Sequence, residues 1–225
     1  MDREWTTGFF KEAVTDVRQV TRLGVEGDGQ ADLVHHGGPD KAINVYPAEH
    51  YAKWSEEVGL TPNAGAFGGN FTTTGLTEAD MYVGDVLCAG ELIVQVSQPR
   101  QPCWKLSRRW RIKYLAARVV RTGRTGWYFR VLNAGMIKAG AVLELIKRPA
   151  PNWSRAAANE VMHHRKDDVS AALELASRVG LSQSWVGSLT CRAGGGKMNA
   201  NGRLTGPLDT QLQVRETVPT YSHQA

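Results

Sequence analysis

Short runs of aliphatic, β-branched and aromatic residues recur through the first 150 positions, and they predict a fold that is mostly β. Each run has the length and composition typical of a strand. Glycine-containing turns separate the runs, and many short strands at close spacing favour a barrel. The clearest four runs cover residues 81–87, 92–96, 127–132 and 142–146.

Two amphipathic segments interrupt these strands and predict helices. Residues 47–58 carry Tyr51, Trp54 and Val58 at helical spacing, and residues 112–120 carry an apolar stripe of the same period. Because the helices interrupt the strands rather than alternate with them, a doubly wound parallel sheet is not expected. The basic side chains that the second helix leaves for solvent or ligand are Lys113, Arg118 and Arg121.

The pattern changes after Pro149-Ala150-Pro151 to short helical segments without strand signals, so a boundary is predicted there. Ser154 can cap a helix through Met162, Asp167 or Asp168 a second through Val179, and Ser182 a third to about Leu189. They carry few large apolar residues, so we expect them to lean on the main domain or on one another. The predicted organisation is a β-barrel domain over residues 1–150, a three-helix domain over 151–190 and a flexible tail over 191–225.

Composition indicates an ordinary globular protein. Of the 225 residues, 42% are hydrophobic and 22% are charged, which is too apolar for wholesale disorder. The chain has no apolar run of the roughly 20 residues that span a bilayer, and its start lacks the apolar stretch of a signal peptide. We therefore expect a cytoplasmic protein without a membrane partner.

Positive charge is concentrated in one segment. The net charge is +5, and residues 100–130 contain ten Lys and Arg but no Asp or Glu. Such a segment indicates an anionic partner. A solvated basic helix face would give the same pattern, and charge alone does not separate the two interpretations.

Three ordered stretches match a known pattern: residues 24–32 (GVEGDGQAD), 36–42 (HGGPDKA) and 97–106 (SQPRQPCWKL). Together they resemble YiiM-type proteins of the MOSC family, and residues 155–185 resemble the three-helix domain that follows MOSC in this subgroup. The resemblance implies a MOSC-type β-barrel, a molybdenum cofactor (molybdopterin), and reduction of N-hydroxylated compounds such as hydroxylaminopurine base analogues. It departs at Gly69, where the family usually has Glu, so one pocket carboxylate is in doubt.

Cys103 is the predicted catalytic residue and the predicted molybdenum ligand. Arg100 and Lys105 lie within three residues of it, and cationic neighbours favour the thiolate, which is a soft metal ligand. Pro99 and Pro102 stiffen its approach, so we expect the sulfur on a fixed loop rather than in a strand ladder. The alternative is a buried structural cysteine, which is the interpretation we give to Cys88 and Cys191. Three widely spaced cysteines predict neither a disulfide framework nor a zinc site.

A pterin cofactor with a phosphate needs hydrogen-bond donors and positive charge. Glycine-rich turns bring backbone amides close to such an anion, and Lys and Arg add charge-assisted bonds. The same glycines would also serve tight barrel turns, and the two roles are compatible. Asp28 and Asp40 flank glycines and are expected mainly to cap turns. The predicted cofactor-binding residues are His36, Gly37, Gly38, Lys41, Asn70, Arg100, Lys105 and Arg124.

Electrons for a reductase must come from a separate partner, because the sequence shows no flavin, haem or iron–sulfur pattern. The expected partners are therefore a small N-hydroxylated substrate and an electron-donor reductase, with a homodimer left open. The alternative function is a carrier of molybdenum cofactor or sulfur without turnover. A nucleic-acid partner is not expected, because residues 182–189 offer only Gln183 for reading bases.

Overall fold

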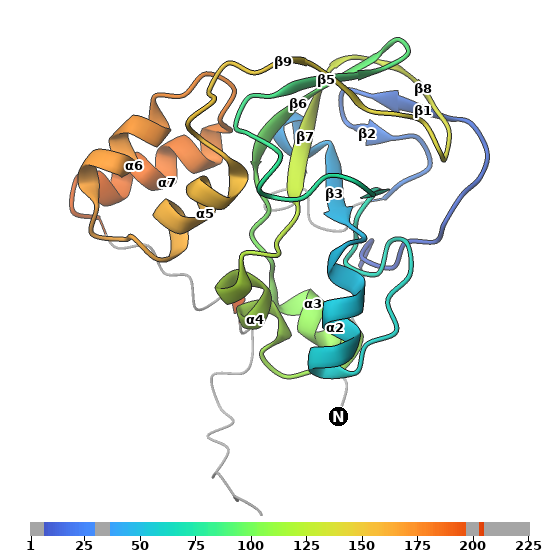
Figure 1. The fold of residues 1–225 in the computed structure, drawn as a ribbon, viewed down its shortest axis with the longest axis horizontal. Helices are drawn as coiled ribbons and strands as arrows, with labels where there is room; N and C mark the ends of the chain where they lie inside the picture. Colours follow the sequence, from blue (N-terminus) through green and yellow to red (C-terminus); the bar gives the residue numbers. More distant parts are fainter. Residues whose placement is uncertain (1–6, 30–36, 197–202, 205–225) are drawn as a thin grey trace, which may run out of the picture.

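The fold is described from a computed structural model, which covers residues 7–29, 37–196 and 203–204. Two sheets form a half-barrel, with one group of helices beneath it and another beside it (Figure 1). The larger sheet has the order β4-β3-β7-β6-β5-β9 and the smaller the order β2-β1-β8. Only β3 and β4 pair in parallel among these described strands.

The bounds of the strands follow from the backbone pairing. The larger sheet contains β3 (Ile43–Pro47), β4 (Phe71–Thr73), β5 (Val86–Ala89), β6 (Leu92–Pro99), β7 (Trp127–Asn133) and β9 (Glu144–Lys147). The smaller sheet contains β1 (Arg18–Thr21), β2 (Gly24–Val25) and β8 (Gly135–Ile137).

The barrel core follows from the two-residue period of its strands. In β6, Leu92, Val94 and Val96 are buried, and Ile93 and Gln95 between them are partly exposed, because successive side chains point to opposite faces of a strand. They pack with Trp127 and Phe129 of β7. Burial of these large apolar side chains stabilises the sheet that carries the site.

The helices beneath the barrel enclose a second core. They are α2 (His50–Val58), α3 (Trp104–Trp110) and α4 (Leu115–Thr122), and the short 3-10 helix η1 (Pro39–Lys41) leads into β3. Tyr46 stacks on Phe67 with ring centroids 4.1 Å apart, and the indole Nε1 of Trp54 donates a 2.6 Å hydrogen bond to the Tyr46 hydroxyl. These contacts tie α2 to the end of β3.

The three C-terminal helices are α5 (Arg155–His163), α6 (Val169–Ala176) and α7 (Gln183–Ala193). Each begins at a predicted cap: Ser154, Asp168 and Ser182 accept hydrogen bonds from the backbone N–H three residues later. Their shared core includes Trp185 and Leu189, and Val83 of the preceding barrel segment joins it.

Polar contacts fasten these helices to the barrel. Ser182 donates from its backbone N–H to Ser97 O at 2.8 Å and from its hydroxyl to Gln98 Oε1 at 2.6 Å. The carbonyl oxygen of Gly126 accepts hydrogen bonds from Arg155 Nη2 at 3.2 Å and from Arg100 N at 3.1 Å. The C-terminal helices therefore lean on the barrel strand that leads to Cys103.

Several predicted boundaries differ from the structure. The strand expected over residues 81–87 begins only at Val86, and Tyr82 forms a single bridge with Ser154. The second C-terminal helix ends at Ala176 rather than Val179, and α7 continues to Ala193 through part of the expected tail. Residues 197–202 and 205–225 of that tail lie outside the described residues. Within the described part of the chain, no helix is long and apolar enough to cross a membrane.

His163 is an uncharged residue at the end of a helix. It is the last residue of α5, half-buried, and its ring meets the edge of Trp185 with centroids 6.5 Å apart. Desolvation, with nearby positive charges, lowers the pKa of His163 to about 3. The imidazole is therefore neutral at physiological pH, because burial outweighs any attraction to the helix dipole.

Candidate functional site

Cys103 lies in the loop between β6 and α3, immediately before the first residue of the helix. Its backbone is extended, with φ −125° and ψ 172°, and its carbonyl oxygen accepts a 3.1 Å hydrogen bond from Leu106 N. Three residues earlier, the hydrogen bond from Arg100 N to Gly126 O anchors the loop to the start of β7. The expectation that Cys103 lies in a loop outside the strand ladder is confirmed.

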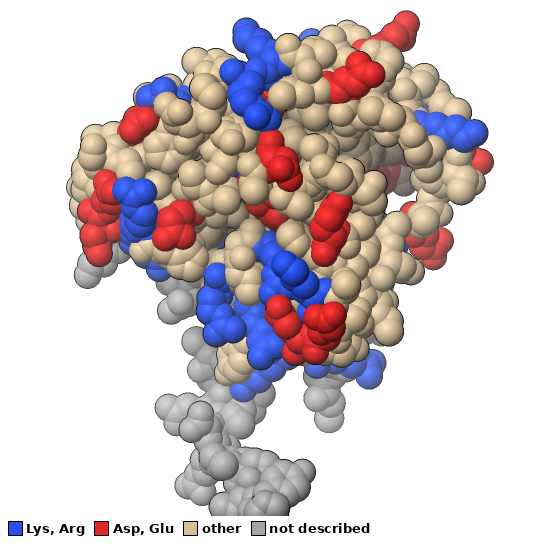
Figure 2. Space-filling model, viewed as in Figure 1, with Lys and Arg blue, Asp and Glu red and all other residues tan. Residues whose placement is uncertain are grey.

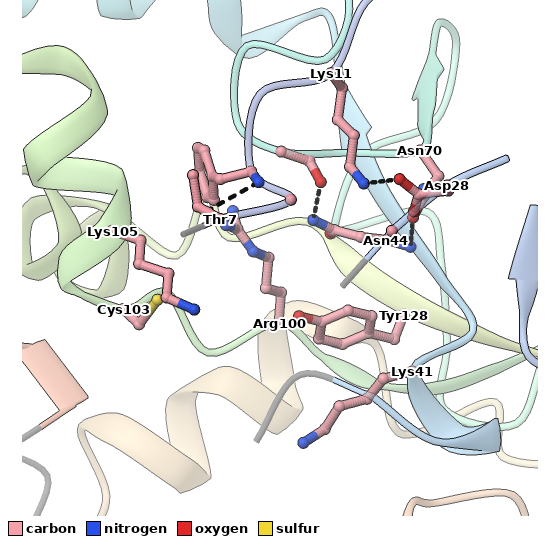
Figure 3. A pocket seen from close by; sticks show the side chains of 14 residues that line it. Thr7, Lys11, Asp28, Lys41, Asn44, Asn70, Arg100, Cys103, Lys105 and Tyr128 are labelled. Carbon is pink, nitrogen blue, oxygen red and sulfur yellow. Dashed lines mark hydrogen bonds and ion pairs between the residues drawn. The ribbon is translucent and has the colours of Figure 1, made fainter. Parts of the chain in front are cut away.

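The Cys103 side chain forms part of the wall of a cavity that holds about 590 Å³ of empty space, including its opening to solvent. Figure 3 shows Arg100 and Tyr128 between Cys103 and Lys105 on one side and Lys11, Asp28, Asn44 and Asn70 on the other. Cys103 itself is 5% exposed. The charged side chains that line the cavity are Lys11, Asp28, Lys41, Arg100 and Lys105.

Arg100 is the most deeply buried cation in this wall, with an exposed fraction of 4%. Its guanidinium lies 5.6 Å from the centroid of the Phe9 ring. Its Nη1 has no hydrogen-bond partner among the described residues. A buried donor left without a partner is costly, so this atom is suited to a ligand in the cavity.

Tyr128 lies beside Arg100 and is also buried. Desolvation raises the pKa of the Tyr128 hydroxyl, although the positive charge of Arg100 and its hydrogen bond oppose this effect. The phenol therefore stays protonated at neutral pH and retains an O–H that can donate.

Asp28 faces the cations from the opposite wall. It forms an ion pair with Lys11 and accepts a 2.6 Å hydrogen bond from Asn70 Nδ2. The other end of the Asn70 amide is also occupied, because Oδ1 accepts from Asn44 N at 2.9 Å. Asn70 thus fixes Asp28 to β3, and Asp28 neutralises one of the cavity lysines.

Asn44 adds a second unpaired polar atom to the cavity. Its Nδ2 donates to Gly68 O at 2.9 Å, which assigns the amide orientation. Its Oδ1 is buried and has no partner within the described part of the chain. The cavity therefore offers an unpaired acceptor at Asn44 and an unpaired donor at Arg100.

The comparisons with known proteins agree with this architecture. Residues 32–144 match the family model described as the MOSC domain. Protein YiiM of Escherichia coli is 41% identical over 182 residues, covering 80% of this chain and 81% of that protein. The chain belongs to the MOSC family. The crystal structure of that YiiM covers 86% of this MOSC chain and 93% of its own, with a TM-score of 0.76.

Two further relatives are similar in sequence to this MOSC protein. The uncharacterised protein YflK of Bacillus subtilis is 46% identical over 179 residues, covering 80% of this chain and 81% of the relative. A protein of Gibberella moniliformis named "Reductase" is 36% identical over 155 residues, which are 67% of this chain but 28% of that protein. The MOSC region in the fungal protein is therefore a minor part of a longer chain.

The structure brings together some of the predicted site residues of this MOSC chain and separates others. Cys103, Lys41, Asn70, Arg100 and Lys105 all line the cavity, whereas Gly37 and Gly38 do not. His36 lies outside the described residues. Gly69, where the family usually has Glu, is buried without lining the cavity.

Arg124 does not line the cavity. Its guanidinium stacks 3.9 Å from the centroid of the Trp54 ring and donates to both carboxylate oxygens of Glu57 at 2.7 Å. The residue follows α4 and faces α2, because the chain has turned at Gly123 before it enters β7. Its position supports a role in joining two helices rather than in holding a cofactor.

The basic run over residues 100–130 is also divided by the fold. Arg100 and Lys105 reach the cavity, and Arg130 pairs with Asp40 at 2.7 Å. Figure 2 shows Lys and Arg side chains on the lobe of α2 and α4, with Asp and Glu beside them. The residues of the run that are exposed are Arg111, Lys113, Arg118 and Arg121. Part of the basic run therefore faces the cavity, and another part faces solvent.

The cavity wall also contains residues that the sequence did not predict, including Thr7, Gly8, Phe9, Lys11, Asn44 and Tyr128. Asn44 could have been found from the sequence, because it is a polar residue inside the apolar run over residues 42–46. A buried side-chain amide in a strand needs hydrogen-bond partners, which can include a ligand. Lys11 could not have been found in this way, because it lies in an irregular segment far in sequence from the Cys103 loop.

Proposed function

We propose that this MOSC protein binds a molybdenum–pterin cofactor through Cys103 and reduces N-hydroxylated compounds with electrons from a partner reductase. The observation that carries the proposal is the placement of the Cys103 side chain in the wall of a cavity lined by four cationic side chains and one carboxylate. A soft thiolate ligand suits a molybdenum centre, and the cations suit the phosphate of a pterin cofactor.

The polar atoms of the cavity fit such a group. Arg100 Nη1 is a buried donor and Asn44 Oδ1 a buried acceptor, both without partners among the described residues. A pterin ring presents donors and acceptors along its edge, and its phosphate presents only acceptors. Lys41 and Lys105 would hold the anion, while Arg100 and Asn44 would orient the rest.

When bound, the cofactor would supply two-electron reduction with removal of the hydroxyl oxygen. The overall reaction consumes two electrons and two protons, cleaves the N–O bond, and releases the amine and water. The chain's own residues bind and orient the reactants. Tyr128, whose pKa is raised by burial, keeps its proton at the cavity wall and is placed to donate a hydrogen bond.

The partner reductase is supported by the longer fungal relative. That protein is named "Reductase", and the region similar to this chain is 28% of its length. The sequence of this chain shows no flavin, haem or iron–sulfur pattern that could carry electrons. We therefore assign the electron donor to a reductase acting in trans.

The test begins with metal and pterin content after expression in a host that makes the cofactor. Wild type is compared with Cys103→Ser and with Cys88→Ser, a half-exposed cysteine in β5 that does not line the cavity. We expect near-stoichiometric molybdenum in wild type and Cys88→Ser and a loss of at least tenfold in Cys103→Ser. Equal metal content in all three proteins would overturn the proposal.

Turnover is then measured with an N-hydroxylated purine base and a chemically reduced electron donor. Amine formation that depends on Cys103 and on the donor supports the reductase. Molybdenum binding without any amine would refute the enzymatic part and favour the carrier.

A further inference from the structure

Arg203 reaches the Cys103 loop from the far end of the chain. Its guanidinium Nη1 donates a hydrogen bond to the carbonyl oxygen of Pro102, across 101 residues of sequence. Pro102 directly precedes Cys103, and its side chain is buried. The contact therefore places a cation beside the residue that carries the candidate ligand.

Arg203 is partly enclosed by the protein rather than surrounded by solvent. Its side chain is half-buried. Desolvation lowers the pKa of Arg203, and negative charge on Cys103 or Tyr128 would act in the opposite direction. Two groups of the cavity are thus within electrostatic reach of the guanidinium.

Among the described residues, no Asp or Glu acts on the pKa of Arg203. Lys11 differs, because Asp28 neutralises it on the opposite wall. An arginine in partial burial without a carboxylate partner raises the local potential and attracts anions.

We propose that Arg203 is an anion-attracting residue of the Cys103 cavity, supplied by the segment that follows the three-helix domain. The inference deepens the proposed function, on which it rests for the identity of the ligand: Arg203 would draw the anionic part of the cofactor toward Cys103. The competing role is purely mechanical, with Arg203 only bracing the Pro102 carbonyl.

The test compares two alkylating reagents on the cofactor-free, full-length protein. Iodoacetate is an anion and iodoacetamide is neutral, and both react with the same thiolate. The ratio of their rate constants at Cys103 therefore cancels the ionised fraction and most of the accessibility of the sulfur, and it reports the local potential. Because Cys88 and Cys191 also carry free thiols, the Cys103 peptide is quantified by mass spectrometry.

We expect Arg203→Met to lower the iodoacetate-to-iodoacetamide ratio by about threefold or more, since one nearby positive charge is removed. Arg203→Lys should retain most of the ratio. Arg192→Met is the matched control, because Arg192 Nη1 makes the same kind of bond to a backbone carbonyl, that of Met162. Added salt should reduce the wild-type ratio through screening.

An unchanged ratio in Arg203→Met overturns the proposal and leaves only the mechanical role, even if both absolute rates change. Circular dichroism shows whether each variant is folded, and Arg203→Gln provides a second neutral substitution. Since no cofactor takes part in this measurement, a protein that fails to bind molybdenum can still show the charge effect. Failure of the Arg203 proposal and failure of the proposed function are thus separate results.

Discussion

Asp28 accepts a 2.6 Å hydrogen bond from the side-chain amide of Asn70, 42 residues further along the chain. The same carboxylate pairs with Lys11, so the only acidic residue among the described lining of the cavity is fully engaged with its neighbours. This arrangement sets the net charge of the wall that faces Cys103.

The first prediction concerns that carboxylate. Asp28→Asn keeps an oxygen for Asn70 but removes the charge that neutralises Lys11, so the cavity becomes more positive. We expect the iodoacetate-to-iodoacetamide rate ratio at Cys103 to rise by about twofold or more. Asp16 is an exposed carboxylate that pairs with Arg18 at 3.5 Å, and Asp16→Asn should leave the ratio unchanged. A similar rise in Asp16→Asn would show that the effect does not come from the charge inside the cavity.

The second prediction distinguishes Arg100 from Arg124, which the sequence analysis both assigned to cofactor binding. Arg100→Met removes the buried donor from the cavity, and we expect at least a tenfold loss of bound pterin and molybdenum. Arg124→Met should retain wild-type cofactor content and lose only the contacts with Glu57 and Trp54, because Arg124 lies outside the cavity. Equal losses in both variants would contradict the assignment of the cavity as the cofactor site.

The third prediction tests the attachment of α7. Ser182 caps the helix and also donates to Gln98 of β6, so Ser182→Ala should lower the free energy of unfolding by about 1–2 kcal/mol. Ser188→Ala is the matched control, since its hydroxyl bonds only within α7, to Ser184 O at 2.8 Å. Urea unfolding of both variants measures the difference, and equal midpoints would refute the role of Ser182.

The fourth prediction concerns Gly126. It has φ +69°, and a Cβ at this position would collide with the carbonyl oxygen of Val45, so Gly126→Ala should cost about 3 kcal/mol or more. Gly75 has φ +79° but open space around it, and Gly75→Ala should cost only about 1 kcal/mol. Thermal unfolding distinguishes the two costs, and a tolerated Gly126→Ala would show that the strand can shift.

The fifth prediction is a pH dependence. Desolvation lowers the pKa of His163 to about 3 in the folded protein, and the ordinary pKa of histidine is about 6.5. Between pH 3 and pH 6.5 the unfolded chain therefore binds the proton more tightly than the folded chain does. Stability from this residue is present above about pH 6.5 and falls as the solution is acidified. His163→Gln should reduce the loss of unfolding free energy between pH 7.5 and pH 5 by about 2 kcal/mol.

The control for this effect is His164→Gln, because the neighbouring histidine is exposed. Glu78 adds a separate acid sensitivity that both variants retain. Burial would raise the pKa of Glu78, but hydrogen bonds from His50 and Gly126 lower it on balance. An identical pH profile in His163→Gln and wild type would show that His163 is not the group responsible.

The sequence predicted what depends on local chemistry. Ser154 and Ser182 were found as helix caps because a short polar side chain before an apolar period has one favourable role. The loop at Cys103 was found because Pro99 and Pro102 restrict the backbone that leads to it. The mostly β architecture followed from strands such as β6, where burial alternates residue by residue.

Long-range geometry could not be predicted in the same way. The short helix α3 was missed because it follows Cys103, which makes no side-chain capping bond. Arg124 was placed at the cofactor on the basis of resemblance, yet the turn at Gly123 directs it to Glu57. Lys11 lines the cavity from an irregular segment, and Arg203 contacts the carbonyl of Pro102 from a segment far along the chain, and no periodic pattern marks such residues.

The shared carbonyl of Gly126 has a further consequence for engineering. One oxygen atom receives Arg100 N from the Cys103 loop and Arg155 Nη2 from the first C-terminal helix. Excising everything after residue 150 would remove the Arg155 donor, whereas Arg100 N and the Thr125 hydroxyl would still donate to this oxygen. A minimal version of this protein that lacks α5 would therefore keep the backbone hydrogen bond that anchors the Cys103 loop and lose a link between the barrel and the C-terminal helices.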